Sequence, residues 1–146
     1  MTQTQRVYDS ERACSWWDKY AMPSEDIAYW FIRDMVQSRV WKRKYKIEPV
    51  VKLAYTSNPM YDGAYWAWGH YPAGFKAYGT IELTLTGQRF SVLLHEFAHL
   101  LCYETLSYMG HEAFFTRCYL DLVGDFLGRS CAEELYSHME RLKVEK

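Results

Sequence analysis

Two histidines and a glutamate stand at the spacing of a metal site between Val92 and Cys102. His95 and His99 are four positions apart, so on a helix their imidazoles share one face and can reach one ion. Glu96 lies about 100° further around the helix than His95, close to a water at the ion but poorly placed to bind the ion itself. The pattern predicts His95 and His99 as zinc ligands, with Glu96 as the general base that moves a proton from water to a leaving amine.

The surroundings of these three residues support a buried metal. They are the only strongly polar residues between Val92 and Cys102, and a helix that is apolar on nearly every side is normally buried. Burying a carboxylate and two imidazoles without partners costs on the order of several kcal/mol. A metal ion with its water would satisfy them. The alternative is a pair of hydrogen-bonded core histidines with Glu96 in a salt bridge.

A third ligand is expected, because catalytic zinc usually has three protein ligands and one open position. His111 is the best candidate, since it follows His99 by twelve residues and Gly110 lets the chain turn back towards the ion. Competing donors are Glu104, Glu112 and Asp121. Glu112 is adjacent to His111 and is also a candidate to support that histidine by a hydrogen bond. We therefore predict one Zn²⁺ per chain.

These residues resemble a known family. The run His95-Glu96-Phe97-Ala98-His99, followed by Gly110-His111-Glu112-Ala113-Phe114-Phe115, resembles the SprT-like (Spartan-type) zinc metallopeptidases and the small metallohydrolases related to them in bacteria and phages. The resemblance covers about Tyr78 to Val123. The chain departs from the family in having Glu112 where glycine is frequent, and in lacking the zinc-ribbon cysteines that follow many of these cores.

The resemblance implies a zincin-like fold and a peptide or protein substrate. It places the strand from Thr80 to Leu85 at the edge of the cleft, where an extended peptide could pair with it. A tetrahedral oxyanion then needs a donor besides the zinc. Tyr78, Tyr108 and Arg117 are candidates, although a structural role would explain each of them as well.

The elements that must position these residues follow from hydrophobic spacing and from breaks at Pro23, Pro49 and Gly128. Ser130 and Glu133 form an expected capping box. We predict one α+β domain over residues 1–146, with N-terminal helices, a small and mostly antiparallel sheet of about three strands, the helix with the two histidines, and C-terminal helices. Helices are expected over about 5–20, 24–45, 89–103, 112–127 and 130–143, and strands over about 50–55, 64–68 and 80–85.

Composition excludes several other functions. With 146 residues, 49% of them hydrophobic and 24% charged, the chain is expected to form a packed core. A net charge of −1 gives no overall positive field for nucleic acid. Only the run from Arg39 to Lys46 mixes cations and aromatic rings as a single-strand binding surface does, and a solvated helix end explains it too. We expect a cytoplasmic protein with four reduced cysteines and no membrane span.

Overall fold

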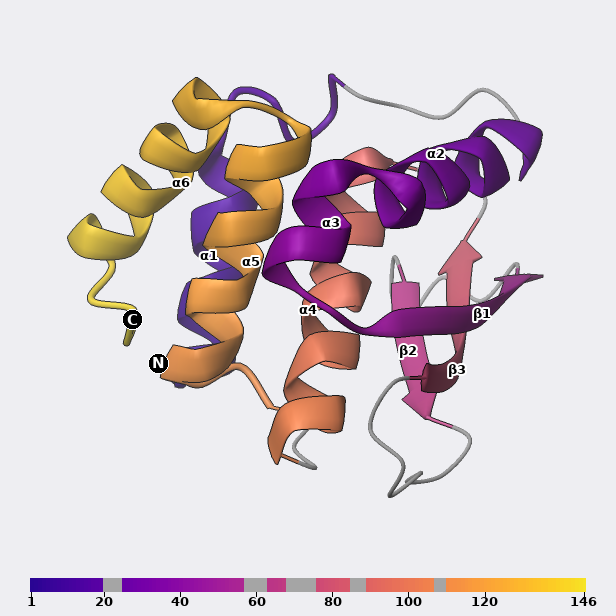
Figure 1. Ribbon diagram of the computed structural model, residues 1–146. Coiled ribbons are helices and arrows are strands. Elements are labelled where there is room, and N and C mark those ends of the chain that lie inside the picture. The colour runs from indigo at the N-terminus through magenta and orange to yellow at the C-terminus, as the bar shows by residue number, and fades with distance from the viewer. Residues whose placement is uncertain (20–24, 57–62, 68–75, 85–88, 107–109) are drawn as a thin grey trace.

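The computed structural model describes residues 1–19, 25–56, 63–67, 76–84, 89–106 and 110–146. Its elements confirm the predicted α+β class, and most of the described residues are helical (Figure 1). In chain order they are α1 (Gln3–Ala13), α2 (Glu25–Gln37), α3 (Arg39–Lys44), β1 (Glu48–Thr56), β2 (Gly63–Ala67), β3 (Lys76–Thr84), α4 (Phe90–Leu106), α5 (Ala113–Phe126) and α6 (Arg129–Arg141).

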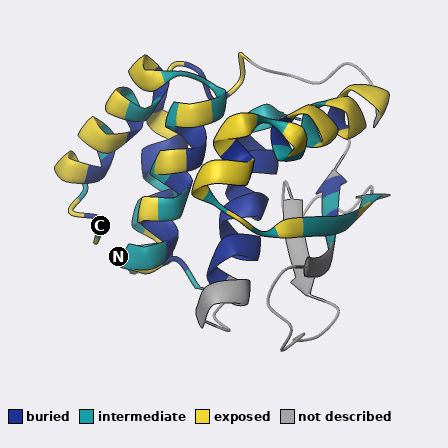
Figure 2. Ribbon diagram, in the orientation of Figure 1, coloured by how far each residue is buried: buried dark blue, intermediate teal, exposed yellow. Residues whose placement is uncertain are grey.

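Helix α4 occupies the centre of the molecule. It contacts β2 and β3 on one side and α5 on the other; α6 packs against α5, and α1 lies beside α6 (Figure 1). All residues from Ser91 to Cys102 are buried, as the dark blue ribbon in Figure 2 shows. This helix is apolar around most of its circumference, so it needs cover from both the sheet and the helices.

The sheet has the strand order β1-β3-β2, with β1 parallel and β2 antiparallel to β3. The prediction of a mostly antiparallel sheet was wrong, because the longer ladder, from Glu48↔Lys76 to Thr56↔Thr84, is the parallel one. The prediction that Thr80–Leu85 forms the edge of the cleft was also wrong: β3 lies between two partners. Alternation of Ile81 and Leu83 with polar neighbours shows that one face is buried, but does not distinguish a central strand from an edge.

Several helix boundaries differ from the predicted ones. The expected helix over 24–45 is two helices, because the hydroxyl of Ser38 accepts a hydrogen bond from the Trp41 amide (3.1 Å) and caps α3. The expected capping box at Ser130 does not form, since Gly128 is the N-cap of α6 and Glu133 pairs with Arg129 at 2.9 Å. Gly128 ends α5 as predicted, with a φ of 118° that favours glycine.

All four cysteines are free thiols. Cys14, Cys102 and Cys131 are buried, whereas Cys118 is partly exposed on α5. Cys14 donates a hydrogen bond to the Ser10 carbonyl at 3.4 Å. Burial, followed by the charge of Glu134, raises the pKa of Cys14 to about 12. Below that pH its thiol stays protonated and is a poor nucleophile.

This arrangement predicts selective alkylation. Treatment of the native protein with iodoacetamide at pH 8 should modify Cys118 first and leave Cys14 unmodified, because Cys14 is both buried and protonated. Peptide mass spectrometry measures the four sites separately. Denatured protein, in which all four thiols should react, is the control, and rapid labelling of Cys14 in the native protein would contradict the packing of α1.

Candidate metal centre

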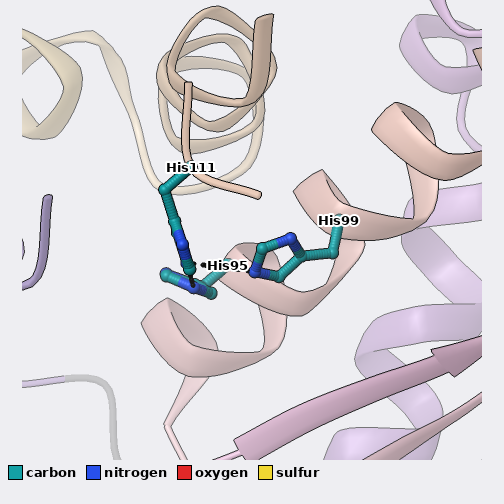
Figure 3. Close-up of side chains that lie close together, drawn as sticks. All are labelled: His95, His99 and His111. Atoms are coloured by element: carbon teal, nitrogen blue, oxygen red, sulfur yellow. Dashed lines mark hydrogen bonds between the residues drawn. The ribbon is translucent and has the colours of Figure 1, made fainter. Parts of the chain in front are cut away.

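Three histidines from two parts of the chain converge beside α4 (Figure 3). His95 and His99 lie one turn apart on α4, and His111 lies two residues before α5 begins. Phe115, in the first turn of α5, is fully buried and packs against all three imidazoles, with ring centroids 4.5–4.9 Å away. The start of α5 thus positions His111 and holds the other two rings in place.

The nitrogens that face one another are the Nε2 atoms. His111 Nε2 lies 3.1 Å from His95 Nε2 and 3.1 Å from His99 Nε2, and one nitrogen from each ring lies within 4.8 Å of the others. Tetrahedral zinc with Zn–N bonds of about 2.0–2.1 Å separates two nitrogen ligands by about 3.3 Å. Three buried histidines at this separation could bind a metal ion.

The protonation states also fit a cation. Burial, followed by the nearby histidines, lowers the pKa of His99 to about 2, and burial, followed by His95, lowers that of His111 to about 3. Both rings are therefore neutral at physiological pH, as metal ligation requires. His95 differs: burial lowers its pKa, but the charge and hydrogen bond of Glu11, together with the charge of Glu96, raise it overall. Three imidazole nitrogens this close need a proton or a cation between them.

Glu96 follows His95 on α4 and is only 5% exposed. Burial raises the pKa of Glu96 to about 7; His95 opposes this rise and the charge of Glu11 adds to it. A carboxyl group with its pKa near the working pH can both accept and release a proton. Glu96 is therefore a buried group suited to general acid–base chemistry, and it follows His95 directly on α4.

Helix α1 contributes residues that the sequence analysis missed. Glu11 is 3% exposed, and its Oε2 lies 2.9 Å from Nδ1 of His95. The Tyr8 ring stacks on His95 and meets His111 edge-on, at centroid distances of 5.8 and 5.1 Å. The Oγ1 of Thr4 lies 3.3 Å from Nδ1 of His111. One signal was available: Val7, Glu11 and Cys14 recur at helical spacing, which puts a carboxylate on the buried face of α1.

The remaining predicted site residues lie elsewhere. Arg117 is exposed on α5, where its guanidinium lies 6.0 Å from the centre of the Phe114 ring. Glu112 is exposed at the N-cap of α5, and within the described residues it is the Thr4 hydroxyl that lies within hydrogen-bond distance of Nδ1 of His111. Tyr78 lies in β3, where the structure describes only its backbone, and Tyr108 is outside the described residues.

Two of the competing donors can be placed as well. Asp121 is exposed on α5 and lies 3.6 Å from the Lys44 ammonium, so it takes part in a surface ion pair. Glu104 lies in α4, and only its backbone is described. Among the described residues, the metal-type cluster is therefore made of histidines alone.

The basic run from Arg39 to Lys46 turns its aromatic rings inward. Trp41 is 2% exposed and donates its Nε1–H to the Ile47 carbonyl at 2.6 Å. Tyr45 is half-buried and donates its hydroxyl to Asp125 at 2.7 Å. These rings are packed against the helices, so they are not available as a platform for stacking bases.

Comparisons with known proteins do not identify a family for the chain. No protein-family model matches the chain, and neither does any curated protein or solved structure. In the part of the chain that the structure describes, every helix is too short or too polar to cross a membrane.

The geometry predicts stabilisation by a divalent cation. Zn²⁺ at about 100 times its dissociation constant should stabilise the fold by about 2.7 kcal/mol and raise the midpoint of thermal unfolding by about 5–10 °C. His111→Ala should abolish this rise, because it removes the nitrogen close to both others.

His138→Ala is the matched control, since His138 lies on α6 beside Arg141, away from the cluster. Elemental mass spectrometry on the same samples should find about one zinc per parent chain, and much less in His111→Ala. Equal stabilisation of the parent and His111→Ala would show that zinc binds elsewhere.

Proposed function

We propose that the protein is a zinc-dependent metallopeptidase of the SprT-like type, with His95, His99 and His111 as ligands and Glu96 as the general base. The observation that carries this proposal is the convergence of three Nε2 atoms, 3.1 Å apart in two pairs, with a buried glutamate directly after His95 in the chain. In a zincin-like arrangement, one helix supplies two histidines and the base, and a later segment supplies the third ligand. The motif and the helix order agree with this arrangement.

In the proposed reaction, the zinc ion and the protein side chains have different tasks. A zinc ion at the three histidines would act as a Lewis acid that polarises the peptide carbonyl and acidifies water. Glu96 takes a proton from the attacking water and delivers it to the leaving amine as the C–N bond breaks. Its pKa of about 7 allows both steps near neutral pH. The buried surroundings of Glu96 strengthen its electrostatic interactions with the reacting groups.

The sheet offers a place for an extended substrate. β2 is an edge strand of the β1-β3-β2 sheet and packs beside α4, whereas β3 is central. A peptide that pairs with β2 would run next to the helix that carries His95, Glu96 and His99. Main-chain pairing recognises an extended peptide largely without regard to its side chains. This favours peptides over small amides as substrates.

Tyr8 is the best-placed donor for the oxyanion. Its ring contacts both His95 and His111, and it is only partly buried. Burial raises the pKa of Tyr8, and the carboxylates of Glu11 and Glu96 raise it further, so the phenol stays protonated and can donate. We assign to Tyr8 the role for which the sequence suggested Tyr78, Tyr108 or Arg117.

Glu96→Gln should separate metal binding from turnover. The amide keeps the size of the side chain but cannot take a proton, so we expect unchanged zinc content and a loss of about 10²–10⁴-fold in kcat. Glu133→Gln, which alters an exposed ion pair on α6, is the control. A library of quenched fluorescent peptides, assayed beside small amides, measures turnover and also tests for a hydrolase of non-peptide amides.

The same variant tests the alternative function, a non-catalytic module that uses a structural metal and binds a protein or nucleic acid through its aromatic and basic surface. That alternative predicts no turnover by the zinc-loaded parent, and ligand binding that Glu96→Gln leaves intact. Turnover that survives Glu96→Gln at the parent rate would contradict the role of Glu96 as base.

Tyr8→Phe should lower kcat with little change in zinc content. Loss of one oxyanion donor costs about 10²–10³-fold in kcat, and the phenylalanine ring still fills the space against His95 and His111. Steady-state kinetics beside zinc analysis measure both effects. A parent-like kcat for Tyr8→Phe would remove Tyr8 from the mechanism and leave the zinc site itself unaffected.

A further inference from the structure

Helix α1 reaches two of the three histidines from the side opposite the converging nitrogens. Glu11 contacts Nδ1 of His95 at 2.9 Å, and Thr4 lies 3.3 Å from Nδ1 of His111. The side-chain Nε2 of Gln3 donates to the backbone carbonyl of His111 at 3.0 Å. In the rings of His95 and His111, Nε2 therefore faces the cluster while Nδ1 faces α1.

The contact between Glu11 and His95 is the strongest of these. Glu11 and His95 are 3% and 5% exposed, so water does not compete for their hydrogen bond. A carboxylate accepts but cannot donate, so Nδ1 of His95 must carry the proton in this pair. In the neutral imidazole, this leaves the lone pair on Nε2, the atom that faces His111.

Packing fixes the ring as well as the proton. Tyr8 stacks on His95 at 5.8 Å from one side, while Phe115 and Tyr119 lie at 4.9 and 5.3 Å. The carboxylate then sets the rotation of the imidazole within this cage. Glu11 also brings a negative charge into a buried site that must accept a divalent cation, which offsets part of the cost of burying that cation.

His99 provides an internal contrast. Its Nδ1 is buried and has no hydrogen-bond partner within the described ranges. His95 and His99 lie on the same helix, yet within the described residues only His95 of the two has a carboxylate at its Nδ1. The partner of His95 comes from a segment 84 positions away in the chain.

We propose that Glu11 is the positioning residue of the metal centre: through its hydrogen bond it holds His95 with the proton on Nδ1 and the lone pair of Nε2 towards the ion. This inference rests on the proposed metal site but extends beyond it, since the motif with two histidines and a glutamate contains no such residue. Because Glu11 lies on α1, this role makes the packing of α1 against His95 a requirement for tight metal binding.

Glu11→Gln tests this proposal with little change in volume. The amide has no charge and is a weaker acceptor, so zinc should bind about 10–100-fold more weakly. Competition against a chelator of known affinity measures this change without any assay of turnover. Asp9→Asn is the matched control: it removes one negative charge from the same helix, where Asp9 accepts a hydrogen bond from Gln5 at 2.8 Å, away from the histidines. Its zinc affinity should equal that of the parent.

A spectroscopic measurement distinguishes positioning from simple support of the fold. In the zinc-loaded parent, the Nδ1 proton of His95 should give a downfield NMR resonance typical of a hydrogen bond to a carboxylate, and Glu11→Gln should shift or remove it. The visible spectrum of the cobalt(II) form should change with it. Circular dichroism of the metal-free proteins shows whether Glu11→Gln is folded. If it is not, Glu11→Asp, which keeps the charge on a shorter arm, should fold and show an intermediate zinc affinity.

The outcomes distinguish the proposal for Glu11 from the proposal for the metal site itself. If the parent binds zinc, and folded Glu11→Gln or Glu11→Asp has parent affinity and an unchanged His95 resonance, the proposal for Glu11 is wrong and the metal site stands. If the well-folded parent binds no divalent metal, both fail. Weaker zinc binding by Glu11→Gln, with parent affinity in Asp9→Asn and a changed His95 resonance, supports the positioning role.

Discussion

The structure depends on the burial of polar side chains on a helix that is otherwise apolar. His95, Glu96 and His99 are each at most 6% exposed on α4, so each needs a partner inside the protein. This need explains why the segment before α5 brings His111 to them and why α1 brings Glu11. The apolar residues of α4 place the same helix between the sheet and α5 (Figures 1 and 2). Core packing and the polar cluster thus share one helix, so the candidate metal centre is built on a fully buried stretch of α4.

The two ends of the described chain meet beside the segment that carries His111. Besides its bond to the His111 carbonyl, Gln3 donates to the Glu145 carbonyl at 3.2 Å and accepts from the Glu145 amide at 3.1 Å. Arg6 donates to the Lys143 carbonyl at 3.0 Å. These bonds hold α1 against the residues after α6, which keeps Glu11 and Tyr8 in place against the histidines. The contacts span more than a hundred residues of sequence, so they form only when the whole fold closes.

The sequence allowed the local part of this picture to be predicted, but not the part that depends on distant contacts. The spacing of His95 and His99 implies a shared face on any helix, and Gly110 marks the turn that returns His111. The spacing of Val7, Glu11 and Cys14 could have placed Glu11 on the buried face of α1, but nothing in the sequence shows that this face packs against His95. The central place of β3 was missed for a similar reason: alternation reports which face is buried, while strand order depends on how the connections run.

Glu11 and Glu96 are both buried near the candidate metal centre, but their positions suit them to different roles. Glu11 lies against Nδ1 of His95, on the side away from the converging nitrogens, so in the proposed metal centre it would act on an ion only through the imidazole. Glu96 belongs to α4 itself, and burial with the added charge of Glu11 raises its pKa to about 7. The charge of Glu11 thus favours a protonated Glu96, while His95 opposes this. A pair of carboxyl groups whose environments separate their proton affinities can divide the work of holding a ligand and moving a proton. The packing of α1 therefore bears both on the proposed metal site of α4 and on the proton affinity of Glu96.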